Sequence, residues 1–535
     1  MKFNFFGNSH WSIAELTPPW DNRPSIYWHI YNHLQDDATG LAEGGEELPD
    51  EEQVRADSQF GWAAGALDGV LGHHAGSDEE TAKKAQEVLR VFRDLTEKDS
   101  DKNAARLYSL LLENNTLSFI DPLLEAITTA EKLDHDRLRT TARWLAMEAA
   151  DREVVKTAIA IIGLYQDNED RDLLMTLGKH EEFTLYSVVA LQNTQDDAEQ
   201  ALWQLAQHVK GWGRIQIIER LANTQDEYIK DWLLREGYQN EIMYEYTALV
   251  CAQTGGLDKA LKQQEIDDEL LKGAGEILST LIAGRGGPAE DIESYEQGAK
   301  ATESYLRHLS ARENNLEALV NADKIEQFLI DDEYGYKTLP ESVSSDWSER
   351  RDYLLELIKS IKAQPGWREK VLEGLQAKER IDFWIATEAA RVLGIDVWEN
   401  YFERIKKDED YWWNVMQTDD PQRIDRIVEF AEKTLPLEEI ATGPANELGL
   451  GLEFKNHQAL DFVLQDLRRF QGKGWTLIKA GLQSPVVRNR NMAITALAAW
   501  DKKDWAKDTE TLLRKALERE PNDETHNLIR KVLNS

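Results

Sequence analysis

The sequence predicts an all-α protein, an α-solenoid of stacked helical hairpins with an atypical aromatic and glycine-rich cap at its N-terminus. Three observations predict this class. A six-residue motif that ends in Asn-Thr-Gln-Asp occurs at residues 191–196 and again at 221–226, a spacing of 30 residues. Apolar residues recur at helical spacing on both sides of each phrase. The 13 prolines and the scarcity of alternating β-branched runs argue against a large sheet.

The region 151–260 is the most regular part of the chain, and each of its periods has the pattern of a helical hairpin. The second period, for example, places Leu185, Val188 and Val189 on the apolar stripe of a helix that ends at the first Thr-Gln-Asp turn. A second, shorter apolar helix follows each turn. Because neither helix of a hairpin can bury its stripe alone, neighbouring hairpins are expected to stack on one another.

Composition and charge exclude several classes of partner. The formal net charge is -36, from 98 acidic against 62 basic residues, and no run concentrates positive charge, so we expect no nucleic-acid partner. No apolar run reaches 18 residues, so we expect no membrane partner. The single cysteine, Cys251, cannot form an internal disulfide, and residues 1–10 lack the apolar segment of a signal peptide. Together these features predict a cytoplasmic protein.

Breaks in the helical pattern suggest a division of the chain into four segments. A glycine-rich turn at 284–288 and a polar loop at 331–340 interrupt the array, and the helices between them carry many charges. Arg285, in the first of these breaks, has a weak potential to bind an anion. The predicted segments are an N-terminal module with an acidic connector (1–77), a helical-repeat array (78–283), a charged helical insert and loop (284–347) and C-terminal repeats (348–535).

Three glycines mark the N-terminal module. Gly61, Gly65 and Gly69 are four residues apart, so on a helix they form one bare strip where another backbone can approach closely. The stretch lacks the Lys-Ser/Thr ending of a phosphate-binding loop. These glycines are therefore predicted to serve close packing.

Histidines gather in the same module. A helix over residues 25–34, with Pro24 in its first turn, places His29 and His33 together at the edge of its apolar stripe. A histidine pair at this spacing can bind a divalent metal. If a second helix faces it, a metal or acid–base cluster could form, although chance clustering and aromatic packing explain the same residues. The candidate functional residues are His29, His33, Asp68, His73 and His74.

Near the C-terminus, one segment carries a recognisable repeat pattern. Pro485 is expected to begin a helix, Val486 to enter the core, and Ala493 and Ala496 to line its packing stripe. Here the chain resembles HEAT and armadillo-like repeat proteins, whose first helix often reads Pro-x-Val-Arg followed by spaced alanines. The match is good over 484–530 and looser elsewhere. The resemblance implies a curved surface that binds partners.

A second resemblance concerns the Gly-Ala-Leu-Asp-Gly-Val-Leu-Gly-His-His stretch at 65–74. It is similar to uncharacterised bacterial proteins, some of which are labelled limonene hydroxylase. The chain contains no cysteine-ligated haem motif and no dinucleotide-binding glycine fingerprint. We therefore predict no cofactor and assign no catalytic residue.

Two functions remain. The first is a non-catalytic helical-repeat scaffold that binds a protein partner through an acidic curved surface. The alternative is a metal-dependent enzyme or ligand binder that uses the N-terminal histidine and aspartate cluster. The sequence favours the scaffold and does not define the oligomeric state.

Overall fold

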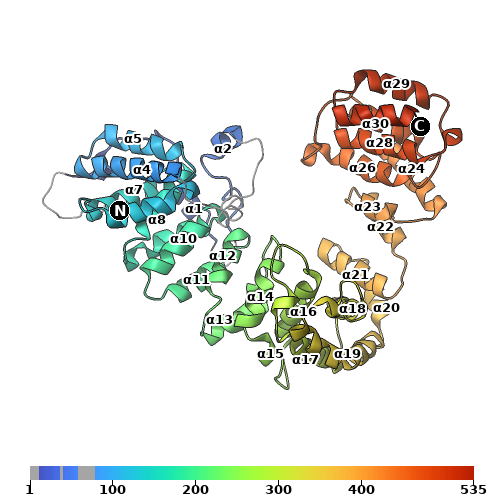
Figure 1. Ribbon diagram of the computed structural model, residues 1–535, viewed down its shortest axis with the longest axis horizontal. Coiled ribbons are helices and arrows are strands. Elements are labelled where there is room, and N and C mark those ends of the chain that lie inside the picture. The colour runs from blue at the N-terminus through green and yellow to red at the C-terminus, as the bar shows by residue number, and fades with distance from the viewer. Residues whose placement is uncertain (1–10, 36–39, 58–78, 535) are drawn as a thin grey trace. The chain divides into compact units, whose positions relative to one another are not determined.

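The computed structural model describes residues 11–35, 40–57 and 79–534 and separates the chain into two units, Met1–Pro365 and Gly366–Ser535 (Figure 1). All regular elements in these ranges are helices, and the one bridge between extended segments joins Glu447 to Val486. The all-α prediction is confirmed. None of the described helices combines the length and apolar character that a membrane span requires.

The first unit contains the N-terminal helices and the regular array. Its α-helices are α1 (Ile26–Asn32), α2 (Glu51–Asp57), α4 (Glu79–Glu97), α5 (Asp101–Leu112), α6 (Ile120–Thr129), α7 (His135–Glu148), α8 (Arg152–Ile162), α9 (Arg171–Gly178), α10 (Glu181–Thr194), α11 (Ala198–Ala206), α12 (Trp212–Arg220), α13 (Glu227–Trp232), α14 (Glu245–Thr254), α15 (Leu257–Ala260), α16 (Asp268–Ala283), α17 (Gly298–Ser310), α18 (Leu316–Ile330) and α19 (Glu341–Lys362).

The second unit contains eleven α-helices among its described residues. They are α20 (Trp367–Gly374), α21 (Arg380–Val392), α22 (Trp398–Ile405), α23 (Trp412–Met416), α24 (Pro421–Thr434), α25 (Leu437–Ile440), α26 (Lys455–Leu467), α27 (Trp475–Leu482), α28 (Val487–Ala499), α29 (Thr509–Arg519) and α30 (Asp523–Asn534).

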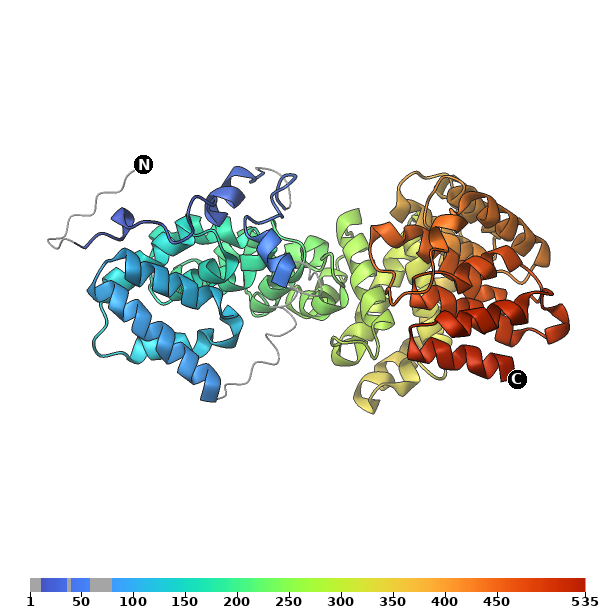
Figure 2. The same ribbon diagram turned by 90° about the horizontal axis from the view of Figure 1, so that it is seen from above.

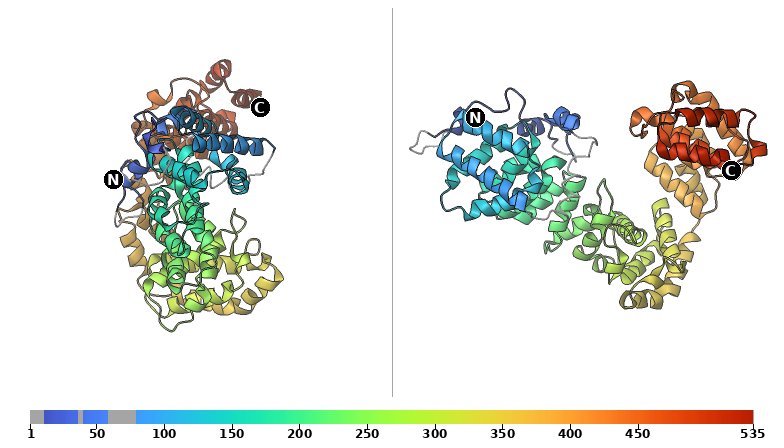
Figure 3. Two further views of the ribbon diagram at one scale, coloured as in Figure 1. Left: turned by 90° about the vertical axis from the view of Figure 1, so that its left-hand side faces the viewer. Right: turned by 45° about the horizontal axis from the view of Figure 1, so that its top comes forward.

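Within each unit, a helix packs against its neighbour in the chain and often against the helix two places further on. In the first unit α8 contacts α10, α10 contacts α12, and α12 contacts α14; in the second, α26 contacts α28 and α28 contacts α30. In Figures 2 and 3, helices of similar colour, which are close in the sequence, lie side by side within their own unit. Stacked hairpins are expected to give contacts of this kind, because each helix would bury one flank on its partner and the other on the next hairpin.

Hydrogen bonds join turns of the first unit that lie 28 to 32 residues apart in the sequence. Asp196 accepts hydrogen bonds from the side-chain amides of Gln166, 30 residues away, and Asn168, 28 residues away. The hydroxyl of Thr254 donates to the carbonyl of Ala222, 32 residues away, at 2.7 Å. The 30-residue sequence period thus corresponds to contacts between equivalent turns in space.

The second Asn-Thr-Gln-Asp turn also starts a helix. Asp226 is the N-cap of α13, and its carboxylate accepts from the backbone N–H groups of Tyr228 at 2.8 Å and Ile229 at 3.3 Å. Asp226→Ala is expected to lower the free energy of unfolding by about 1 kcal/mol, because two N–H groups at the helix start lose their acceptor. Urea denaturation followed by circular dichroism measures the change.

The control for this variant is the adjacent Glu227→Ala, whose carboxylate is exposed and pairs with Lys230. Asp226→Asn retains a capping oxygen and is expected to stay within a few tenths of a kcal/mol of the wild type. Equal losses for Asp226→Ala and Glu227→Ala would contradict the capping role.

One predicted apolar stripe is partly wrong. In α10, Val188 is buried, but Val189 is 37% exposed and Leu185 is half-buried. Glu181, Leu185 and Val189 are spaced by four and form the narrow solvent-facing strip of a helix that is covered on its other sides by α8, α9, α11 and α12. Most of the surface of α10 is therefore buried. Phe183, rather than Val189, belongs to the core.

Two predicted helix starts are wrong by two residues for the same reason. Ser25 is the N-cap of α1, so Pro24 precedes the helix, which begins at Ile26. In the same way Pro485 precedes α28, which begins at Val487. Each proline fixes the extended backbone just before the cap residue rather than the first helical turn.

The two predicted breaks lie between helices of the first unit, and Arg285 joins them. Its Nη1 donates to the carbonyls of Tyr334 at 2.5 Å and Gly335 at 3.1 Å. These two bonds hold the turn after α16 against the loop after α18. The guanidinium therefore has a structural role here.

Candidate functional site

Helix α1 carries the two candidate histidines that the structure describes. The rings of His29 and His33 have their centroids 4.5 Å apart. His33 Nδ1 donates to the carbonyl of His29 at 2.8 Å, and His29 Nε2 donates to that of Gly45 at 3.2 Å. Each ring therefore uses one nitrogen as a backbone donor, which leaves the other nitrogen as a lone-pair site.

The remaining candidates cannot be placed beside this pair. Asp68, His73 and His74, and the packing glycines Gly61, Gly65 and Gly69, lie outside the described residues. Within residues 11–35, 40–57 and 79–534, no group of three or more His, Cys, Asp or Glu side chains is arranged to hold a metal ion. The described part of the predicted cluster is thus a histidine pair.

A third histidine, which the sequence did not single out, is buried near this pair. His180 is 1% exposed and is the N-cap of α10: its Nδ1 accepts from the backbone N–H of Glu182 at 3.2 Å. Its Nε2 donates to the carbonyl of Glu46 at 3.3 Å. Both ring nitrogens are therefore occupied in the neutral tautomer, and burial lowers the pKa of His180 to about 4. Burial and the nearby His33 also lower the pKa of His29.

The neutral state of His180 predicts a pH dependence. Its folded-state pKa lies below the ordinary value of 6.5, so the stability it contributes is complete above pH 6.5 and is lost as the pH falls to about 4. In that window the unfolded chain binds a proton that the folded chain does not, which costs on the order of 3 kcal/mol. Urea denaturation at a series of pH values from 7 to 4 measures this loss.

The comparison variant is His180→Asn, which keeps an oxygen for the N-cap and cannot titrate. Its stability is expected to fall less steeply between pH 6.5 and 4 than that of the wild type. Burial raises the pKa of Glu46, so this carboxyl adds to the stability as the pH falls. It does so in both proteins and therefore does not affect the comparison. Parallel pH curves for the two proteins would contradict the assignment.

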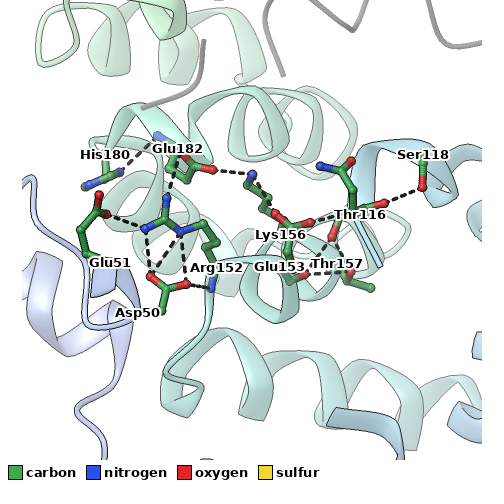
Figure 4. A network of polar contacts seen from close by, with 11 residues as sticks. Asp50, Glu51, Thr116, Ser118, Arg152, Glu153, Lys156, Thr157, His180 and Glu182 are labelled. Atoms are coloured by element: carbon green, nitrogen blue, oxygen red, sulfur yellow. Dashed lines mark hydrogen bonds and ion pairs between the residues drawn. The ribbon is translucent and has the colours of Figure 1, made fainter. Parts of the chain in front are cut away.

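An ionic network lies beside the histidines, centred on Arg152 at the start of α8 (Figure 4). Asp50 accepts from the Arg152 backbone N–H at 2.8 Å and from its Nη2 at 3.1 Å. Nη2 also lies 2.7 Å from Glu51, and Nη1 lies 3.8 Å from Glu182. Burial alone would lower the pKa of the guanidinium, but the hydrogen bonds and charge of Asp50 raise it above its ordinary value. Arg152 is therefore a fixed cation.

One helical turn further along α8, a lysine extends the network. The ammonium of Lys156, a residue only 2% exposed, lies 2.5 Å from Glu182 and 3.2 Å from Glu153. The other carboxylate oxygen of Glu153 accepts from the backbone N–H of Thr116 at 2.6 Å. Figure 4 shows this continuous chain of polar contacts from residue 50 to the segment before α6.

A second set of bonds ties the N-terminal segment to the same helices. Arg23 forms a bidentate pair with Asp151 at 2.6 Å, and the hydroxyl of Tyr108 donates to the same carboxylate. The backbone N–H of Ile26 donates to the carbonyl of Ala149 at 3.0 Å. The cations and carboxylates pair with one another, so the arrangement acts as a clamp that holds residues 23–35 and 40–51 on α7, α8 and α10.

Comparison of the chain with models of known protein families and with curated proteins found no match. The all-helical architecture is compatible with helical-repeat proteins. The comparisons support neither a particular repeat family nor the hydroxylase label. The function is therefore inferred from the charge, burial and contacts of the chain itself.

Proposed function

We propose that the protein is a non-catalytic helical-repeat scaffold that binds a protein partner through the acidic surface of its first unit. The distribution of charge is the observation that carries this proposal. Residues 1–365 contain 68 Asp and Glu against 36 Lys and Arg, whereas residues 366–535 contain 30 against 26. Of the net charge of -36, the first unit therefore carries -32 (36 minus 68) and the second unit -4 (26 minus 30).

The ion pairs of the first unit leave this acidic excess on its surface. Several of its cations are turned inward or held by carboxylates, among them Arg23, Arg152, Lys156 and Lys362. Outward-facing carboxylates such as Glu227 and Glu269 have side chains that are 86% and 84% exposed. A surface of this kind attracts a basic partner and speeds its association.

The shape that we infer for this surface is that of a HEAT-like solenoid. The bonds between turns 28 to 32 residues apart support a regular stack of hairpins. Such a stack presents an extended face made of equivalent positions on successive units. We infer that residues 11–35 and 40–57 cap this array, which the Arg23–Asp151 and Arg152–Asp50 pairs support.

The test uses the full chain as bait at about 50 mM salt, where surface charges are weakly screened. A basic protein captured in stoichiometric amount is then purified, and its dissociation constant is measured at low and at physiological salt. The proposal expects several-fold weaker binding at the higher salt. Failure to capture a stoichiometric partner, or an affinity that salt does not change, would contradict it.

A charge variant locates the surface. The double variant Glu227→Gln/Glu269→Gln removes two exposed carboxylates of the first unit and is expected to weaken binding several-fold. Its matched control, Glu429→Gln/Glu510→Gln, removes two carboxylates of the second unit whose side chains are 67% and 63% exposed. Equal effects of the two double variants would place the partner elsewhere.

The alternative of a metal-dependent enzyme or ligand binder is favoured only by the adjacent rings of His29 and His33, each with one ring nitrogen not used by the backbone. Metal analysis of the purified chain separates the two proposals. If the purified chain contains stoichiometric metal and the His29→Ala/His73→Ala variant does not, the metal-dependent function is supported and the scaffold proposal is rejected. A metal-free wild-type protein whose variant behaves identically would remove the alternative.

A further inference from the structure

A polar pocket lies between the turn that follows α20 and one face of α22 in the second unit. Its volume is about 390 Å³, within the range of sites that bind small molecules. Gln376 and Lys378 line it from the turn, and Asn400, Glu403 and Lys407 line it from α22 and the residues just after it. Each of these five residues is exposed or half-buried, so a ligand in the pocket can reach its side chain.

One buried arginine joins the two walls of this pocket. Arg404 of α22 is 8% exposed, and its guanidinium donates to the carbonyl of Ala377 in the turn and, at 2.5 Å, to Glu409. The same guanidinium stacks on the buried ring of Phe383, 3.6 Å from the ring centroid. The turn and α22 are therefore held in place by contacts of the chain itself, and the pocket does not have to form when a ligand binds.

The charges that line the pocket leave two cations without a partner. Each lining carboxylate is already paired with a cation: Glu399 with Arg426 at 2.5 Å, Glu403 with Lys406 at 2.6 Å and Glu409 with Arg404 at 2.5 Å. The ammonium groups of Lys378 and Lys407 form no ion pair within the part of the chain that the structure describes. The pocket therefore offers two positive charges to a ligand that carries two negative ones.

The uncharged groups of the pocket suit hydroxyls. The side-chain amides of Gln376 and Asn400 can each donate and accept, and the carboxylate of Glu403, which is 59% exposed, has lone pairs beyond its contact with Lys406. None of the described side chains that line the pocket is aromatic, so it lacks a surface on which a nucleobase would stack. These groups match a hydroxyl-rich body that carries one doubly charged group.

We propose that this pocket binds a sugar phosphate. A phosphomonoester carries close to two negative charges at pH 7, and its oxygens accept charge-assisted hydrogen bonds from Lys378 and Lys407. The sugar hydroxyls bond to Gln376, Asn400 and Glu403. The net charge of the second unit is only -4, so its field opposes an anion weakly. This site does not depend on the acidic surface of the first unit.

The test is isothermal titration calorimetry of the full-length protein in phosphate-free buffer with glucose 6-phosphate, fructose 6-phosphate and ribose 5-phosphate. At least one of them is expected to bind with a dissociation constant in the millimolar range or below, and the same sugar without its phosphate at least tenfold more weakly. Lys378→Gln/Lys407→Gln is expected to weaken the binding of the sugar phosphate at least tenfold, because both contacts to the phosphate are lost. Asn400→Ala is expected to weaken it several-fold and to leave the binding of inorganic phosphate unchanged.

The matched control is Lys507→Gln/Lys515→Gln, which removes two exposed lysines of the same unit that do not line the pocket. It changes the net charge equally, and its affinity is expected to equal that of the wild type. Circular dichroism checks each variant, and the single variant Lys407→Gln replaces the double variant if the latter does not fold. The proposal is overturned if no sugar phosphate binds at millimolar concentration, if inorganic phosphate binds as tightly as the best sugar phosphate, or if the two double variants weaken binding equally. Tighter binding of the dicarboxylate succinate would identify a carboxylate site and would also overturn it.

Discussion

Glu520→Ala is expected to lower the free energy of unfolding of the second unit by about 3–5 kcal/mol. Glu520 and Arg490 both have side chains that are 1% exposed, and they form a bidentate pair at 2.6 and 2.8 Å. The remaining guanidinium nitrogen donates to the carbonyls of Ser484 and Pro485. Removing the carboxylate would leave a buried cation without a counter-charge, which is the most costly outcome for such a pair.

Urea denaturation, with hydrogen exchange to locate the change in α28, α29 and α30, measures this effect. The control is Glu510→Ala in α29, the helix whose C-cap residue is Glu520. Glu510 pairs with Arg514 where both side chains are 63% exposed, so its loss is expected to cost less than about 0.5 kcal/mol. The double variant Arg490→Met/Glu520→Leu replaces the pair by apolar side chains and is expected to recover most of the loss. A small effect of Glu520→Ala, comparable with that of Glu510→Ala, would show that the pair is not closed in solution.

Asp50→Ala is expected to cost about 3 kcal/mol and to release the N-terminal segment from α8. Asp50 is 2% exposed and accepts from the backbone and the guanidinium of Arg152. Arg152 would keep Glu51 and Glu182 as neighbours, which places the loss at the lower end for a buried pair. Hydrogen exchange is therefore expected to become faster over residues 40–51 while α12 to α19 stay protected.

The control for this variant is Glu52→Ala, because Glu52 is exposed two residues further along the chain. It is expected to leave both the stability and the exchange rates unchanged within error. Unchanged exchange over residues 40–51 in Asp50→Ala would mean that apolar contacts, not the clamp, hold the segment in place.

The helical architecture could be predicted from the sequence because its signal is local. Apolar spacing identified the helices, and the 30-residue period matched the bonds that join Asp196 to Gln166 and Asn168. The predicted start of a helix was too early where a proline precedes the N-cap residue, as Pro24 precedes Ser25 in α1. Val189 was assigned to the core because periodicity alone cannot show that α10 is covered on most of its surface.

The buried charges could not be predicted in the same way. Lys156 and Arg490 are surrounded in sequence by residues that suit a helix, and a charged residue is ordinarily assigned to solvent. Each is buried because its partner, Glu182 or Glu520, comes from a helix end 26 or 30 residues away. A lysine between the apolar residues of α8 was the one local sign of this network.

His180 was missed for a related reason. Its burial depends on the carbonyl of Glu46, which is 134 residues away in sequence. The histidines that were singled out, His29 and His33, were found by their spacing on one helix, and the structure confirms that they are adjacent. Local spacing can therefore identify a pair on one element, whereas a group assembled from distant segments needs the fold.

The bonds between successive turns have a consequence for how this region can change in length. Because the turn at Asp196 bonds a turn about 30 residues earlier, a single inserted residue between them shifts the donors Gln166 and Asn168 out of register with their acceptor. Duplication or deletion of a segment of about 30 residues would instead bring similar turns together again. The whole hairpin is thus the natural step by which such an array lengthens or shortens.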